Sequence, residues 1–323
     1  MEALRLFRIP FRAMGSACEL VLCGTGGAQL EPFARAAMDE VLRIEAKYSR
    51  YRSDSVLSTI NAGAGRKAVE IDFETLALLR YAQELYRNSD GLFDITSGVL
   101  RGAWDFVSAR LPAPGELEAL LPLVGWPQVE VQEHRHGNKG GYRDGIGDGD
   151  GAREKRGGSV FLPHAGMELD FGGFGKEYAT DRAWGVLHGM GMKHGYVNLA
   201  GDMRFLGPKP DGTPWMIGIQ HPRQNGALLA TIPVSDGALA TSGDYEKYFE
   251  ANGQRYCHIL DPRTGMPVTH WRTVSVVAPL AAMAGSLTTT AMLLQGRGLS
   301  LLHASDVKFL AMDKDGALFT PNG

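Results

Sequence analysis

The stretch that most constrains the fold is LDFGGFGKEYATDRAWGVL, residues 169–187. Gly172, Gly173 and Gly175 allow the backbone to turn tightly or to approach a ligand closely, and Lys176 places a cation directly after them. A turn of this kind in front of a helix favours phosphate binding, because the helix N-terminus adds its own N–H groups. An ordinary glycine-containing loop before a helix has the same residue pattern. The stretch predicts a turn followed by a packed helix, with anion binding as its candidate function.

Helical periodicity recurs elsewhere in the chain. Apolar residues at helical spacing predict a helix over residues 32–48, a second in DFETLALLRYAQELYRNSDG and a short one over residues 113–126. Alternating residues predict two strands joined at Met14 and Gly15, and a run of antiparallel strands and tight turns after residue 194. A small-residue helix, AAMAGSLTTTAM, follows near the C-terminus.

Charge and apolar content exclude two function classes. The chain has 33 Lys and Arg against 36 Asp and Glu, so it lacks the basic excess typical of nucleic-acid binding. No apolar run is long enough to cross a bilayer, and no signal peptide or lipoprotein cysteine is visible, so we expect a cytoplasmic protein without membrane insertion. The three cysteines show no metal-binding spacing, and we interpret them as small apolar core residues: Cys18, Cys23 and Cys257.

One segment differs sharply in composition. From about residue 133 to 158 the chain is rich in glycine and charge and has almost nothing to bury. We interpret it as a flexible insertion at the surface. Its DGIGDGDG run lacks the closing glutamate of a calcium loop.

Three further places carry candidate site residues. Tyr51 lies among arginines and is suited either to stack on a flavin or adenine ring or to form a half-buried turn. In GLFDITSG, Asp94 and Thr96 can bind ribose hydroxyls or cap the next element. A strand pattern in RYCHILDPRTG puts His258 just ahead of a turn, where a histidine is suited to proton transfer.

Taken in order, these pieces resemble the ApbE family of FAD:protein FMN transferases. The matching motifs are AMGS with YSRYRSDSVLSTIN, GLFDITSG, LDFGGFGKEYATD, VNLAGDM, TSGDYEKYF with RYCHILDPRTGMP, and AAMAGSLTTTAM. The resemblance runs from about Met14 to the end and omits only the insertion.

The resemblance implies an α/β (α+β) fold: a single T-fold-like domain over residues 1–323, with mixed, largely antiparallel sheets and packed helices. It also implies that FAD is the substrate and that Mg²⁺ assists cleavage of its pyrophosphate. FMN would pass to a threonine of a target flavoprotein, and AMP would be released. Many members of the family are periplasmic.

The same resemblance assigns residues by motif. His258 would be the base for the attacking threonine, and the metal would take the carbonyl oxygen of Gly173 and the hydroxyl of Thr289. The contacts to FAD would be Met14, Tyr51, Leu92, Phe93, Asp94, Asp170, Lys176 and Val268.

The chain departs from the family pattern at two positions. Gly285 stands where the family usually has a metal-binding aspartate, and Glu177 stands where it usually has glycine. One hypothesis is that Glu177 replaces the lost carboxylate; the interpretation that we prefer from sequence alone is that Glu177 faces solvent. Two alternatives to the transferase therefore stay open: an FAD-binding protein with reduced or lost transfer, and a slow pyrophosphatase that releases FMN and AMP.

Overall fold

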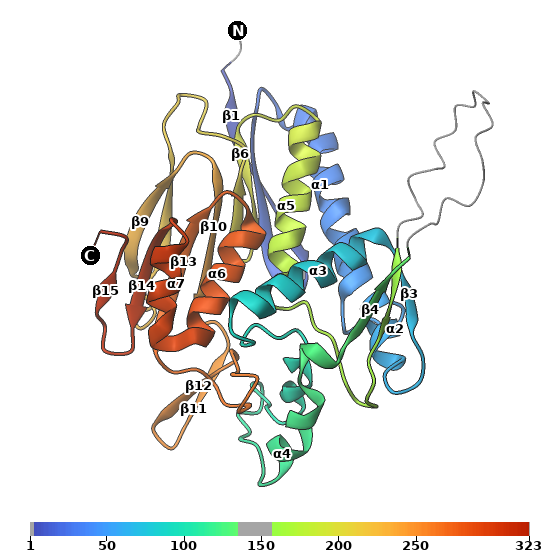
Figure 1. Cartoon of the computed structure of the whole chain (residues 1–323). Coiled ribbons are helices and arrows are strands. Elements are labelled where there is room, and N and C mark those ends of the chain that lie inside the picture. The colour runs from blue at the N-terminus through green and yellow to red at the C-terminus, as the bar shows by residue number, and fades with distance from the viewer. Residues whose placement is uncertain (1–2, 135–156, 323) are drawn as a thin grey trace, which may run out of the picture.

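The computed structural model describes residues 3–134 and 157–322, and its largest element is an eight-stranded antiparallel sheet (Figure 1). Each neighbouring pair of strands in this sheet runs antiparallel. In spatial order the strands are β1 (Arg5–Ala13), β2 (Ser16–Gly24), β6 (Gly195–Leu199), β7 (Asp202–Phe205), β10 (Gly237–Gly243), β13 (Trp271–Ala278), β14 (Lys308–Asp313) and β15 (Leu318–Phe319).

The first hairpin turns at Met14 and Gly15, as predicted. Both residues have positive φ, 52° and 69°, which is the backbone of a two-residue turn that matches the twist of the flanking strands. The turn therefore projects Met14 beyond the end of the hairpin, over the start of α5 (Gly175–Gly189).

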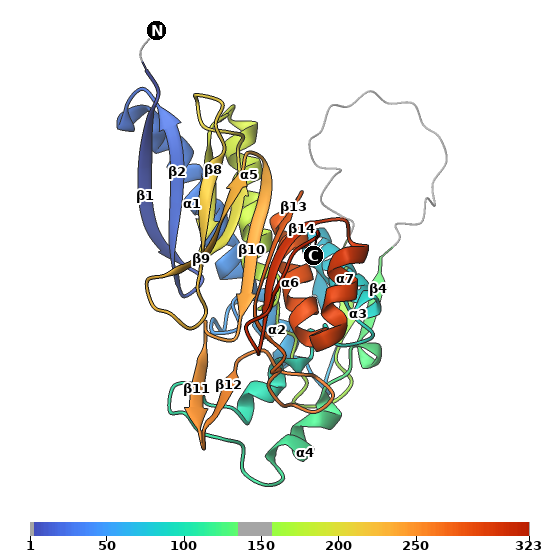
Figure 2. The same cartoon turned by 90° about the vertical axis from the view of Figure 1, so that its left-hand side faces the viewer.

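Helices cover one face of the sheet (Figure 2). Alternation along the strands sends Leu20, Val197 and Val274 into the main core beneath these helices. Their neighbours Val21 and Tyr196 point to the other face, where a two-stranded sheet of β8 (Trp215–Gln220) and β9 (Leu228–Val234) covers them. The helices that contact the strands of the eight-stranded sheet most are α1 (Gly27–Tyr48), α5 (Gly175–Gly189) and α6 (Ala281–Leu294). The other helices of the described residues are α2 (Val56–Ala62), α3 (Phe73–Asn88), α4 (Glu116–Leu120) and α7 (Gly298–Ala304), with short 3-10 turns η1 (Ser97–Gly102), η2 (Leu121–Leu123), η3 (Trp126–Gln128) and η4 (Gln295–Arg297).

A third cluster forms around Trp104. Its indole N–H donates to the carbonyl oxygen of Gly265 at 2.8 Å, and its ring contacts Phe249 and Tyr256 in the hairpin of β11 (Tyr248–Ala251) and β12 (Gln254–Cys257). This cluster fixes the hairpin that leads into His258 against the segment that follows α3.

A small three-stranded sheet holds the two ends of the predicted insertion. Its order is β3 (Val69–Ile71), β5 (Gly158–Phe161) and β4 (Glu130–Glu133), and Glu133 pairs with Gly158. The insertion itself, at about residues 133–158, falls mostly outside the described residues.

The fold class agrees with the prediction: the chain combines helices with antiparallel sheets in one domain. Two helix boundaries differ. α1 begins at Gly27, five residues before the predicted start, because Leu30 is also buried and Pro32 is accommodated inside the helix. The short helix predicted over residues 113–126 is α4 followed by two 3-10 turns. Within the described ranges, every helix is too short or too polar to span a bilayer.

Candidate active site

Phenylalanines anchor the glycine turn before α5. Phe171 and Phe174 are buried with ring centroids 5.1 Å apart, and the ring of Phe93 packs against that of Phe174. A Cβ added at Gly173 would lie 2.8 Å from Phe93 Cζ, so this position requires glycine. The aromatic rings therefore hold the turn rigid, with the N-terminus of a 15-residue helix behind it.

Asp170 precedes the turn and faces two arginines. Asn61 fixes the approach by bonding both the N–H and the carbonyl oxygen of Leu169, at 2.8 and 3.0 Å. The Asp170 carboxylate forms an ion pair with Arg101, and Arg50 Nη1 lies 3.8 Å away. Asp170 therefore holds a cationic pair beside the glycine turn.

Lys176, the first residue after the turn glycines, is paired. Its Nζ lies 3.2 Å from Oδ2 of the buried Asp202. Burial lowers the pKa of the Lys176 ammonium, but the charges of Asp202 and Glu177 outweigh that effect and raise it. Alternation along β7 explains the contact, because Asp202 is on the helix-covered face while Met203 is in the opposite core.

Glu177 does not face solvent, so the interpretation that we preferred from sequence is wrong. The residue is only 7% exposed and lies against Gly285 of α6. Burial, and then the charge of Asp202, raises the pKa of the Glu177 carboxyl. It lies three residues before the buried Thr180, on the side of α5 that packs against α6.

Hydroxyl groups line the facing side of α6. Thr289 Oγ1 lies 3.3 Å from Oγ of Ser242 in β10, and Ser242 also bonds Thr288 at 2.8 Å. Asp181 of α5 sets the start of α6 by accepting the N–H groups of Ala281 and Ala282, both at 2.9 Å. The predicted ligand Thr289 is thus held at a defined place relative to α5.

His258 follows the end of β12, and both its N–H and its Nδ1 contact the carbonyl oxygen of Lys247. The residue as a whole is exposed to solvent. Protein atoms around the ring, and then the charges of Lys247, Lys176 and Arg101, lower the pKa of His258 to about 4. His258 is therefore a neutral imidazole at pH 7, able to accept a proton.

Tyr51 is 84% exposed, with the guanidinium carbon of Arg50 4.6 Å from its ring centroid. Burial of its hydroxyl opposes the shift, but the hydrogen bond and charge of Arg50, with Arg101 and Lys247, lower the pKa of Tyr51. Because Arg101 and Lys247 act on both Tyr51 and His258, the two predicted site residues share one cationic environment.

Four other predicted contact residues point their side chains into the protein. Leu92, Phe93 and Val268 belong to the main core. Asp94 accepts from the N–H and hydroxyl of Thr96 and from the N–H of Trp126, at 2.6–2.9 Å. Of the two interpretations left open for Asp94, its side-chain bonds are those of a cap, so these segments would contact a ligand through their backbone.

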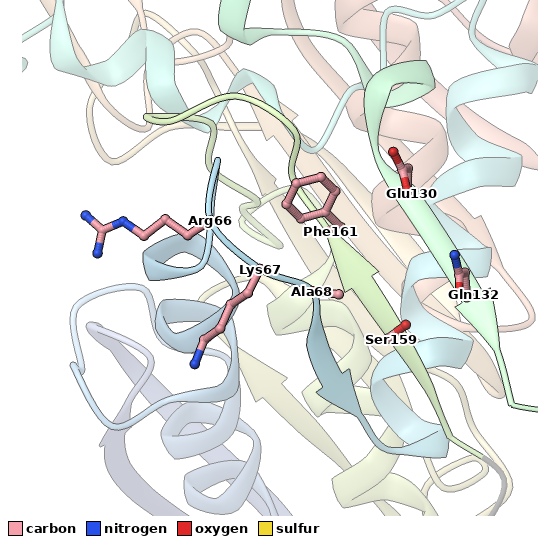
Figure 3. A pocket seen from close by; sticks show the side chains of 7 residues that line it. All are labelled: Arg66, Lys67, Ala68, Glu130, Gln132, Ser159 and Phe161. Atoms are coloured by element: carbon pink, nitrogen blue, oxygen red, sulfur yellow. The ribbon is translucent and has the colours of Figure 1, made fainter.

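The pocket in Figure 3 lies elsewhere. It has a volume of about 230 Å³, and its lining comes from the three-stranded sheet and the segment before β3. None of the predicted site residues lines it. The lining residues are Arg66, Lys67, Ala68, Glu130, Gln132, Ser159 and Phe161.

Sequence reasoning missed three residues that shape this region: Arg101, Lys247 and the capping Asp181. Asp181 closes the LDFGGFGKEYATD motif, which is the signal that marks it. In the described part of the chain, no cluster of three or more His, Cys, Asp or Glu side chains could hold a metal ion. A cation here would need other protein oxygens beside a carboxylate.

Known proteins resemble this chain over most of its length. A model described as the ApbE family matches residues 14–311. An FAD:protein FMN transferase of Treponema pallidum is 32% identical over 275 residues, 80% of this chain and 71% of that protein. One from Vibrio cholerae is 28% identical over 84% of this chain and 76% of its own length.

Solved structures share the fold. A crystal structure of the ApbE protein from Thermotoga maritima has a TM-score of 0.82 and 29% identity, covering 98% of this chain and 97% of that one. The apo flavinyl transferase ApbE of Pseudomonas stutzeri has a TM-score of 0.79 and 26% identity, covering 98% and 95%.

Proposed function

The chain belongs to the ApbE family, and on that premise we propose that it is an FAD:protein FMN transferase. Curated relatives with this activity are 25–32% identical over most of the chain. The match over residues 14–311 is the observation that carries the proposal, because it spans the glycine turn, Lys176, His258 and α6 together.

The reaction moves a phosphoryl group that carries riboflavin. The acceptor, a threonine hydroxyl of a target flavoprotein, attacks the phosphorus on the flavin side of the FAD pyrophosphate. The bond from that phosphorus to the bridging oxygen breaks, AMP leaves with the bridging oxygen, and the hydroxyl proton goes to a base. Catalysis of such a step rests on positioning and on stabilising charge on the phosphate oxygens.

The chain's own residues supply these functions. Lys176 and the N–H groups at the start of α5 would bind the pyrophosphate, with Arg101 and Lys247 adding positive potential. His258, neutral at pH 7, would take the proton from the threonine. The exposed ring of Tyr51 would stack on the flavin or the adenine.

A divalent cation fits the donor set at the junction of α5 and α6. Mg²⁺ prefers oxygen ligands, and Gly173 offers a carbonyl and Thr289 a hydroxyl there. When bound, such an ion neutralises charge on the pyrophosphate oxygens.

The test separates the three open activities by their nucleotide products. Purified protein is incubated with FAD, Mg²⁺ and a candidate flavoprotein that lacks its covalent flavin, and the soluble nucleotides are separated by chromatography. Transfer predicts AMP without an equal amount of free FMN. Equal FMN and AMP would indicate a pyrophosphatase, and intact bound FAD would indicate a binding protein; either result contradicts the proposal.

A further inference from the structure

Glu177 is a buried carboxylate with an unpartnered oxygen. It is only 7% exposed, and among the described residues its Oε2 has no hydrogen-bond partner. Leaving a charged oxygen unpaired inside a protein is costly, so such a group normally binds a cation or loses its charge.

The neighbouring polar groups are already engaged elsewhere. Lys176 pairs with Asp202, and the hydroxyl of Tyr81 bonds Ser286 and the carbonyl oxygen of Ala282. One lysine therefore serves two buried carboxylates, those of Asp202 and Glu177. With both carboxylates ionised, these three groups sum to a charge of minus one, which an added cation would balance.

The Glu177 side chain occupies the place of a side chain at position 285. A Cβ built on Gly285 would lie 2.4 Å from Glu177 Oε1 and 2.5 Å from Glu177 Cγ. Real atoms do not approach so closely, so Glu177 and any larger residue at 285 exclude each other as they stand. The carboxylate thus reaches from α5 to the surface of α6.

Two further oxygen donors lie four residues away along the chain, one from Gly285 and one from Glu177. Thr289 is four residues after Gly285 on α6, and Gly173 is four residues before Glu177 in the turn that leads into α5. A carboxylate, a hydroxyl and a backbone carbonyl are the ligand types that Mg²⁺ and Mn²⁺ share.

We propose that Glu177 is the protein carboxylate that binds the divalent cation of this site, from α5 instead of from α6. The inference rests on the proposed function for the role of the cation. Its test measures cation binding and does not depend on transfer.

The test uses Mn²⁺ as the probe, alone and with ADP as a pyrophosphate ligand. Binding is followed by loss of the free-ion EPR signal for the wild type, for Glu177→Gln and for Glu84→Gln. Glu84 is an exposed acid of α3 that pairs with Arg87, so its variant controls for charge. We expect one Mn²⁺ site, weakened at least about tenfold in Glu177→Gln, since even outer-shell changes cost 10–100-fold, and unchanged in Glu84→Gln.

The melting temperature of the metal-free protein shows whether Glu177 acts as a metal ligand or has a structural role. Glu177→Gln removes a buried charge and keeps the shape, so we expect the metal-free variant to melt at or above the wild-type temperature. Mn²⁺ should raise the melting temperature of the wild type and not that of the variant. Equal Mn²⁺ affinity in the two proteins, or no binding to the wild type under either condition, would overturn the inference.

Moving the carboxylate from position 177 to position 285 tests whether side chains at the two positions reach the same cation site. Glu177→Gly should lose the Mn²⁺ site, and Glu177→Gly with Gly285→Asp should recover most of the affinity. If the double variant stays as weak as Glu177→Gly, the shared-place argument fails. If the protein transfers FMN but its Mn²⁺ affinity does not depend on Glu177, this inference alone is overturned. If Mn²⁺ binding depends on Glu177 but no FMN is transferred, only the proposed function is overturned.

Discussion

The carboxylate of Asp181 in α5 accepts the N–H of Ala281 at 2.9 Å, and so joins the middle of one helix to the first turn of another. Its second oxygen accepts the N–H of Ala282. Because Glu177 and Gly285 face each other between these same helices, this cap sets the distance across which the proposed cation site forms.

Removing the cap should destabilise the protein. Asp181→Ala leaves two helix N–H groups without acceptors and takes the nearest carboxylate from the buried Arg204, 3.8 Å away. We expect a loss of about 2 kcal/mol in the free energy of unfolding by urea titration. Asp181→Asn, which keeps one acceptor, should lose less. An Ala variant as stable as the wild type would show that the cap contributes nothing.

Gly173 should tolerate no side chain while Phe93 is present. Gly173→Ala forces a Cβ to within 2.8 Å of Phe93 Cζ, and we expect a loss of about 1–3 kcal/mol in unfolding free energy. Phe93→Leu in the same chain should recover part of it. Gly185→Ala in α5 is the control, since an added Cβ there meets nothing within 4 Å. Similar losses at both glycines would contradict the steric argument.

Glu74 should contribute stability that depends on pH. Burial opposes its ionisation, but hydrogen bonds from Arg43, Lys47 and Tyr178 prevail and hold the pKa of Glu74 well below its ordinary value near 4.5. A carboxylate whose pKa is lower in the folded than in the unfolded protein stabilises the fold at pH values above the unfolded pKa. This stabilisation is lost progressively as the pH falls toward the folded pKa. Glu74→Gln should cost about 2 kcal/mol at pH 7 and progressively less below pH 4.5. A difference that stays constant from pH 7 to pH 3 would rule out this linkage.

His258 should titrate in the acid range. Desolvation of its ring by nearby protein atoms, and then the charges of Lys247, Lys176 and Arg101, lower the pKa of His258 to about 4, so it stays neutral through the physiological range. NMR titration of the ligand-free protein should place the midpoint near 4, and Lys247→Met should raise it. The acid limb of kcat/KM for FAD should move in the same direction, because kcat/KM reports the free enzyme. A midpoint near 6.5 that is insensitive to Lys247 would contradict the electrostatic description.

Local patterns predicted most of the framework. The hairpin turn at Met14 and Gly15, the helices and the turn before α5 follow from residue periodicity and backbone preferences, which act over a few positions. The same periodicity gave no clear signal for Glu177. It lies six and ten residues from the buried Ala183 and Leu187, roughly 120° and 80° around the helix, so its burial against Gly285 depends on the packing of α5 on α6.

Contacts between distant segments could not be predicted in this way. Asp181 and Ala281 are 100 residues apart, and Asn61 and Leu169 are 108 apart. The residues next to Asp94 in the sequence do not show whether its carboxylate caps the chain or binds a ligand. The hydrogen bond from the N–H of Trp126, which is distant in sequence, identifies it as a cap. These pairings follow from the order of strands in the sheet, which periodicity along a single segment does not determine.

The most direct measurement is the intact mass of an acceptor flavoprotein after incubation with this protein, FAD and Mg²⁺. We expect a mass increase of one FMN less one water, no increase when the acceptor threonine is changed to alanine, and a strongly reduced yield with His258→Gln. An acceptor whose mass does not change, while the protein holds intact FAD or releases equal FMN and AMP, would contradict the central claim.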